Sequence, residues 1–201
     1  SSSAINVSWI HFLSRMADEP ADWNQQKIGE LTYIAEVKEF NEPGGMMDQY
    51  STAMGYLIYL ESKPKISIQS LNPNLGTFVL GDSNEPKDTM GILARCRDAR
   101  LRILDKLKKQ NTSFSLYTSN NDFKLNDLTE EEKTLFHGTI QNRDFLKYAL
   151  LELEKTEQNH KKIGKLLSDH HAVLRDVLNV STPKIEAMLE AAMDAGALGG
   201  K

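Results

Sequence analysis

The segments with β-strand character are confined to one short stretch in the middle of the chain, which limits the fold more than any other feature. Three such segments, separated by turn residues, cover residues 56–61, 65–71 and 77–83. The sequence on either side has the spacing of apolar residues that is typical of helices. This order predicts an α+β fold with few strands and with helices around them. We expect a boundary in the loop after the second segment, which gives domains 1–74 and 75–201.

Helical spacing is clearest in the opening residues. Five large apolar side chains recur there at that spacing: Ile5, Trp9, Phe12, Leu13 and Met16. The pattern predicts a helix over 4–16 that is buried on most of its surface. Further helices are expected over about 23–40, 89–110, 143–158 and 160–178, with one capped by Thr129 and a last one that starts at Pro183.

The composition limits the classes of partner. The 201 residues include 28 acidic and 24 basic side chains, so the formal net charge is -4, which argues against a dedicated nucleic-acid surface. No run approaches the roughly 18 apolar residues that a membrane span requires. Because Cys96 is the only cysteine, no intrachain disulfide can form, and we expect a reducing, cytoplasmic location.

Three consecutive serines at the start of the first predicted helix are the first candidate site. The N-terminus of a helix offers unpaired backbone N–H groups and the positive end of a dipole, which suits phosphate. The hydroxyls of Ser1, Ser2 and Ser3 would add donors, and a hydroxyl can also ligate Mg²⁺. The alternative is a simple N-cap, a position at which serine is preferred in any case.

Two acidic residues near a glycine pair are the second candidate. Residues 43–49 read PGGMMDQ, and glycine lets a backbone turn sharply or approach a ligand closely. Asp48 ends this turn, and Glu36 precedes it on a predicted helix. In phosphoryl transfer, one acid and a hydroxyl can hold Mg²⁺ while another acid orients or deprotonates an attacking alcohol. Equally, Glu36 can be a solvated helix acid and Asp48 the cap of a short following helix.

Several motifs occur in the order found in one enzyme superfamily. Ala35-Glu36, Pro43, Gly45 and Met47-Asp48-Gln49 match the spacing that galactokinases have around their catalytic aspartate. The opening SSSA is similar to the second half of the nucleotide-binding motif GLSSSA. A third galactokinase stretch is matched by His171, Leu174, Arg175, Asp176, Val180, Ser181 and Pro183. The chain therefore resembles the GHMP kinase superfamily, and galactokinases in particular, over nearly its whole length.

The resemblance implies a two-domain GHMP kinase fold of which this chain is an internal piece. Residues 1–74 would be part of the N-terminal ATP-binding domain, and 75–201 most of a helix-rich, ferredoxin-like C-terminal domain. Family members have a sugar-binding segment and a glycine leader before SSSA, and a glycine-rich motif after a stretch like AGALGGK. Because both are expected to be missing, we expect this piece to be a poor kinase by itself.

The activity implied is ATP-dependent transfer of the γ-phosphoryl group to an alcohol, with ATP and Mg²⁺ as cofactors and a sugar or related alcohol as substrate. By the same resemblance Asp48 would be the catalytic base or orienting carboxylate. Ser3 and Glu36 would ligate Mg²⁺, and Ser1 and Ser2 would lie along the phosphates. Gly45 would present its backbone N–H to the substrate. His171 and Arg175 would have structural roles.

The sequence departs from galactokinases at Ile92, where those enzymes have a tyrosine that helps to hold the sugar. The polar residues Asn84, Lys87 and Asp88 of the same loop could read a different acceptor, so we predict Asn84 and Asp88 as substrate-binding residues. A mevalonate-type kinase and a non-catalytic ligand sensor of the same fold are the alternatives to a sugar kinase.

Overall fold

The computed structural model of the chain describes residues 2–42, 44–85, 89–117 and 124–201. It divides into two compact units, Ser1–Asn72 and Pro73–Lys201. The fold is a mixture of helices with one two-stranded antiparallel sheet, so the α+β class is confirmed. Within the described residues, no helix combines the length and the apolar character needed to cross a bilayer.

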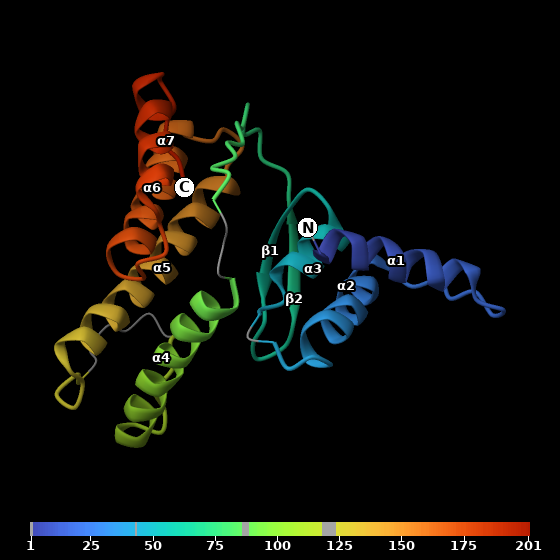
Figure 1. The fold of residues 1–201 in the computed structure, drawn as a ribbon, viewed down its shortest axis with the longest axis horizontal. Helices are drawn as coiled ribbons and strands as arrows, with labels where there is room; N and C mark the ends of the chain where they lie inside the picture. Colours follow the sequence, from blue (N-terminus) through green and yellow to red (C-terminus); the bar gives the residue numbers. More distant parts are fainter. Residues whose placement is uncertain (1, 43, 86–88, 118–123) are drawn as a thin grey trace. The chain divides into compact units, whose positions relative to one another are not determined.

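The first unit is built from three helices and a hairpin. Its helices are α1 (Ser2–Met16), α2 (Gln25–Tyr33) with a π-helical continuation η1 (Ile34–Lys38), and α3 (Met47–Met54). The side chain of Asn24 caps α2 by accepting a hydrogen bond from the backbone N–H of Lys27. Helix α3 packs against α1, α2 and the first strand, and Figure 1 shows it between the hairpin and the other two helices.

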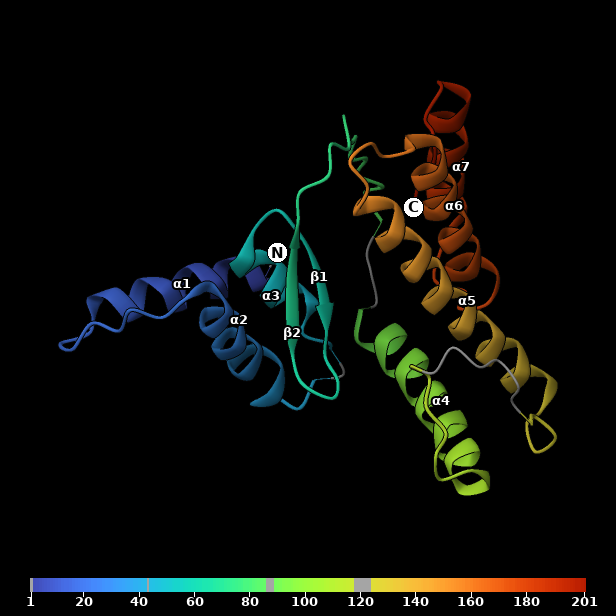
Figure 2. The same ribbon diagram turned by 180° about the vertical axis from the view of Figure 1, so that it is seen from behind.

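The hairpin pairs β1 (Leu57–Glu61) with β2 (Ser67–Leu71) in antiparallel register, and Figure 2 shows the two strands from the other side. Two of the three expected strands are therefore present. The third, expected over 77–83, is absent, and its apolar residues Phe78, Val79 and Leu80 are exposed. A strand needs a partner to pair its backbone N–H and C=O groups. The described part of the second unit contains only helices, so it offers none.

The described residues of the second unit form four helices, α4 (Thr89–Gln110), α5 (Glu130–Leu153), α6 (His160–Asp176) and α7 (Pro183–Asp194). Thr129 and Glu132 form the predicted capping box at the start of α5. The sequence predicted a separate helix over 143–158, but α5 runs through its first part without a break. No proline interrupts that segment. Gly138 lies earlier in α5, and a Cβ there would come within 2.9 Å of Val177 Cγ1, so close packing against the end of α6 favours a glycine at this position.

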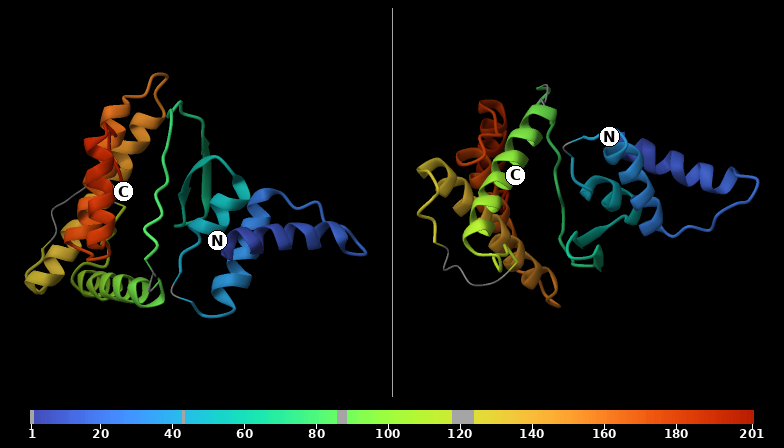
Figure 3. Two further views of the ribbon diagram at one scale, coloured as in Figure 1. Left: turned by 45° about the horizontal axis from the view of Figure 1, so that its top comes forward. Right: turned by 90° about the horizontal axis from the view of Figure 1, so that it is seen from below.

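The core of the second unit lies between α4 and α5. Its buried members are Ile103, Leu107, Leu128, Phe136 and Ile140. Figure 3 shows α5, α6 and α7 grouped together. The last residues fold back on α6, where the backbones come so close that a Cβ at Gly164 would lie 2.2 Å from the carbonyl oxygen of Leu198.

The expected burial of the first helix is wrong. Its buried residues are Ser3, Val7 and Ser14, while the apolar stripe that predicted burial is exposed. Trp9 is 57 % exposed and stacks on Phe12 with ring centroids 5.5 Å apart. The helical spacing of the apolar residues was read correctly, but it shows only that one face of the helix is apolar. None of the described residues covers that face.

Candidate functional site

Ser3, at the start of α1, is buried in the interior of the first unit. Its side chain is only 3 % exposed, whereas Ser2 is exposed. The Ser3 hydroxyl accepts a hydrogen bond from the side-chain nitrogen of Gln49, at 3.3 Å. A residue of α3 therefore contacts the beginning of α1, at the helix end whose N–H groups and dipole favour anions.

Gln49 also contacts Glu36. The same nitrogen donates to Glu36 Oε2 at 2.9 Å, so one buried amide joins a hydroxyl and a carboxylate from two other elements. Gln49 is 3 % exposed, and its oxygen Oε1 is buried with no hydrogen-bond partner among the described residues. Buried polar atoms normally have a partner, so this oxygen lacks a donor that a ligand or water would supply.

Glu36 lies in the π-helical turn that continues α2. The backbone N–H of Glu39 donates to the carbonyl of Ile34, five positions earlier, instead of the four of an α-helix. Such turns are rare and are often found at functional sites. The extra residue sets the direction of Glu36 relative to the rest of α2.

The electrostatics of the site favour an ionised Glu36. Partial burial opposes ionisation, but the side chains of Ser2, Gln49, Ser3 and Asn6 donate hydrogen bonds that together outweigh it and lower the pKa of the carboxyl. Glu36 is therefore not a freely solvated helix acid. Ser2 and Ser3 both turn toward it, so the first candidate site and one acid of the second form a single cluster.

Asp48 immediately precedes Gln49, in the first turn of α3, and its side chain is exposed. It does not cap that helix, because the N-cap is Met46 and no side chain makes a capping hydrogen bond there. A carboxylate in the first turn is favoured by the helix dipole. The acid predicted to be catalytic is thus next to the residue that contacts Ser3 and Glu36, and it is open to solvent.

Gly45 precedes α3, and the fold itself does not require a glycine there. Its φ is not positive, and a Cβ added to it would meet no atom within 4 Å. A glycine that the fold does not need is compatible with a ligand that approaches the backbone.

Three predicted residues remain: Ser1, Asn84 and Asp88. Ser1 and Asp88 lie outside the described residues. Asn84 belongs to the second unit, has a φ of 54°, and donates its backbone N–H to Asp82 Oδ1 at 2.8 Å. That contact is part of a local turn and does not indicate a function.

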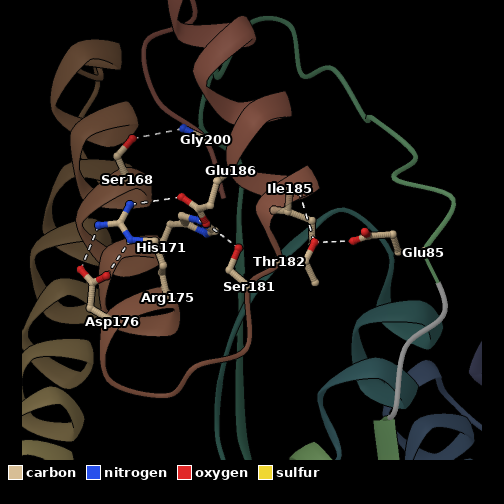
Figure 4. A network of polar contacts seen from close by, with 10 residues as sticks. All are labelled: Glu85, Ser168, His171, Arg175, Asp176, Ser181, Thr182, Ile185, Glu186 and Gly200. Atoms are coloured by element: carbon tan, nitrogen blue, oxygen red, sulfur yellow. Dashed lines mark hydrogen bonds and ion pairs between the residues drawn. The ribbon is translucent and has the colours of Figure 1, made fainter.

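A second polar cluster joins α6 to α7 and is shown in Figure 4. Glu186 accepts hydrogen bonds from Ser181, from His171 Nε2 at 2.7 Å and from Arg175 at 3.2 Å. Hydrogen bonds from Ser181 and His171 are the main reason why the pKa of Glu186 falls to about 2. Arg175 also pairs with Asp176. These contacts fix the start of α7 against α6, as the predicted structural roles of His171 and Arg175 require.

His170, the neighbour of His171, is half-buried. Burial, with the positive charges of Lys201, His171 and Arg100, lowers its pKa to about 4. Within the described residues, no group of three or more His, Cys, Asp or Glu side chains could hold a metal ion.

Sequence reasoning did not single out Gln49, although a signal for its buried contacts was present. Met46 and Ala53, one turn before and one turn after it, place this glutamine on the apolar side of a short helix. A polar side chain in such a position needs a buried partner.

No protein-family model matches the chain, and no curated protein matches it.

Proposed function

We propose that the chain carries the nucleotide-binding and metal-binding side of an ATP-dependent kinase that phosphorylates an alcohol group of a sugar or a related small molecule. The observation that carries the proposal is the contact of Gln49 with both Ser3 and Glu36. It brings the helix start, a hydroxyl and a carboxylate into one cluster, with Asp48 as the next residue along α3.

The cluster fits Mg²⁺ bound to a nucleotide. Magnesium in nucleotide enzymes is commonly held by only one or two protein carboxylates, with substrate phosphates and water completing its shell. Glu36 offers an ionised carboxylate and Ser3 a buried hydroxyl, while the oxygen of Gln49 still lacks a donor. Ser3 and Glu36 would hold the ion, which when bound would neutralise phosphate charge during transfer.

The protein's own groups would bind and orient the reactants. The backbone N–H groups at the start of α1 and the hydroxyls of Ser1 and Ser2 would contact phosphate oxygens. Gly45 would offer its backbone N–H to the acceptor. Asp48 is exposed, so it could accept a proton from an acceptor hydroxyl or orient that hydroxyl. Asn84 and Asp88 are proposed to contact the acceptor, within the GHMP kinase fold that the sequence resembles.

Calorimetric titration with ATP, with and without Mg²⁺, tests the proposal directly. We expect saturable binding that depends on Mg²⁺, and at least tenfold weaker binding after Ser3→Ala or Glu36→Gln. Glu39→Gln is the matched control, because Glu39 is exposed at the end of the same helical segment. Nucleotide binding that is absent, or that both site variants leave unchanged, would contradict the proposal. ADP release with a panel of sugars and mevalonate-like alcohols would then identify the acceptor class.

A further inference from the structure

Gln49 has an orientation that its neighbours fix. Its nitrogen faces the carboxylate of Glu36, which only accepts hydrogen bonds when ionised. Exchanging the two ends of the amide would set an oxygen against that carboxylate. Turning the amide around therefore does not supply a donor for Oε1, which has none among the described residues.

An apolar side chain would fit this position without leaving an acceptor unpaired. A buried acceptor without a donor is unfavourable, and an apolar side chain of similar length in the same space carries no such penalty. Position 49 is only 3 % exposed, and it is nevertheless occupied by a glutamine. Its two hydrogen bonds go to the two side chains proposed to ligate Mg²⁺.

We propose that Gln49 is a positioning residue for the metal ligands, an assignment that rests on the proposed function. Its nitrogen holds Glu36 Oε2 and the Ser3 hydroxyl in a fixed relation before any ligand binds. Its oxygen accepts a hydrogen bond from a water molecule that enters with the nucleotide. Residues that orient metal ligands in this way commonly change metal affinity by about 10- to 100-fold when they are replaced.

The variant Gln49→Met separates positioning from stability. Methionine has a similar length, lacks the donor and removes the unpartnered oxygen. We expect the midpoint of urea unfolding to be unchanged or higher, while the affinity for ATP with Mn²⁺ falls about tenfold. Mn²⁺ is used because its electron paramagnetic resonance signal reports the free ion directly. Gln26→Met is the control, since Gln26 is exposed on α2.

One further measurement is independent of turnover. The carboxyl ¹³C chemical shift of Glu36 should change in Gln49→Met without any nucleotide, because the hydrogen bond to its Oε2 is lost. Gln49→Leu, with the same expectations, serves if Gln49→Met does not unfold cooperatively.

The outcomes distinguish this assignment from the proposed function. If the wild type binds ATP with Mn²⁺ and Glu36→Gln weakens that binding, but Gln49→Met equals the wild type in affinity and in the carboxyl chemical shift of Glu36, only the assignment of Gln49 is wrong. If neither replacement of Gln49 folds, the residue is needed for the fold and the assignment is also wrong. If the wild type itself does not bind, the proposed function fails and the assignment fails with it.

Discussion

Gly29 of α2 lies directly against Tyr50 of α3. A Cβ added to Gly29 would be 3.1 Å from Tyr50 Cδ1 and 3.2 Å from Tyr50 Cα, and the tyrosine is only 1 % exposed. Because Tyr50 follows Gln49 in α3, this contact sets how closely the helix that carries Asp48 and Gln49 approaches the helix that leads to Glu36. The geometry of the candidate site thus depends on a residue that is not part of it.

Replacing Gly29 with alanine should therefore weaken both the fold and the site. Alanine gains up to about 1 kcal/mol of helix propensity, but overpacking a closed contact costs about 1–3 kcal/mol. The tyrosine backbone is one of the atoms in the way, so α3 must shift. We expect a net loss of about 1 kcal/mol in the free energy of unfolding, measured with urea, and weaker ATP binding. Gln26→Ala, at an exposed position of α2, should be neutral or slightly stabilising; an equally stable Gly29→Ala would show that α3 yields easily.

Replacing Asp48 with asparagine should separate binding from chemistry. The side chain is exposed and outside the cluster of Ser3, Glu36 and Gln49, so ATP should still bind with nearly unchanged affinity. Loss of a general base typically costs about 100- to 10,000-fold in rate. Turnover, followed by ADP release with the best acceptor, is the measurement. Near-normal turnover would remove Asp48 from the mechanism.

Replacing Glu186 with glutamine should loosen α7 from α6. The carboxylate accepts hydrogen bonds from His171, Ser181 and Arg175, and the amide nitrogen of glutamine would face donors instead. We expect a loss of about 1–2 kcal/mol in the free energy of unfolding. Glu190→Gln is the control, because Glu190 is exposed on the same helix. Equal urea midpoints for the two variants would contradict the structural role.

The same carboxylate predicts how stability depends on pH. The pKa of Glu186 is lowered from 4.5 to about 2 in the folded state. Its stabilising contribution is therefore complete above pH 4.5 and is lost as the pH falls from 4.5 toward 2. Urea unfolding at several pH values in this window should show a shallower decline for Glu186→Gln than for the wild type. Parallel declines would mean that other carboxyl groups dominate the acid sensitivity.

Replacing Gly164 with alanine should detach the end of the chain from α6. The new Cβ would lie 2.2 Å from the backbone oxygen of Leu198, and backbone cannot move aside as a flexible side chain can. The hydrogen bond from the N–H of Gly200 to the hydroxyl of Ser168 should then be lost, since it lies in the same segment. Faster amide hydrogen exchange at residue 200 would reveal this. Lys165→Ala is the control: it replaces the neighbouring, exposed side chain and should leave that exchange rate unchanged.

Local signals predicted where α5 and α7 begin in the second unit. The capping box of Thr129 and Glu132 and the proline at the start of α7 are recognisable from sequence, because they satisfy backbone groups within a few residues. The expected strand over 77–83 failed for the opposite reason. Strand formation depends on a partner elsewhere in the chain, and the sequence pattern of one segment does not contain that information.

The candidate site was predicted only in part. The residue types at Ser3, Glu36 and Asp48 indicated phosphate and metal chemistry, but their spacing did not show that Gln49 joins two of them. The π-helical turn also has no signature in the apolar periodicity of α2. Burial of the first helix was overestimated because an apolar face does not specify what covers it.

The π-helical turn makes the length of one segment as important as its composition. Removing Ala35, an exposed residue, would let Ile34–Lys38 wind as regular α-helix and would rotate Glu36 by about 100° relative to α2. The carboxylate would then point away from Ser3 and Gln49 although every residue of the cluster was still present. Shortening this helical segment by one residue would therefore disrupt the site more completely than many substitutions within it.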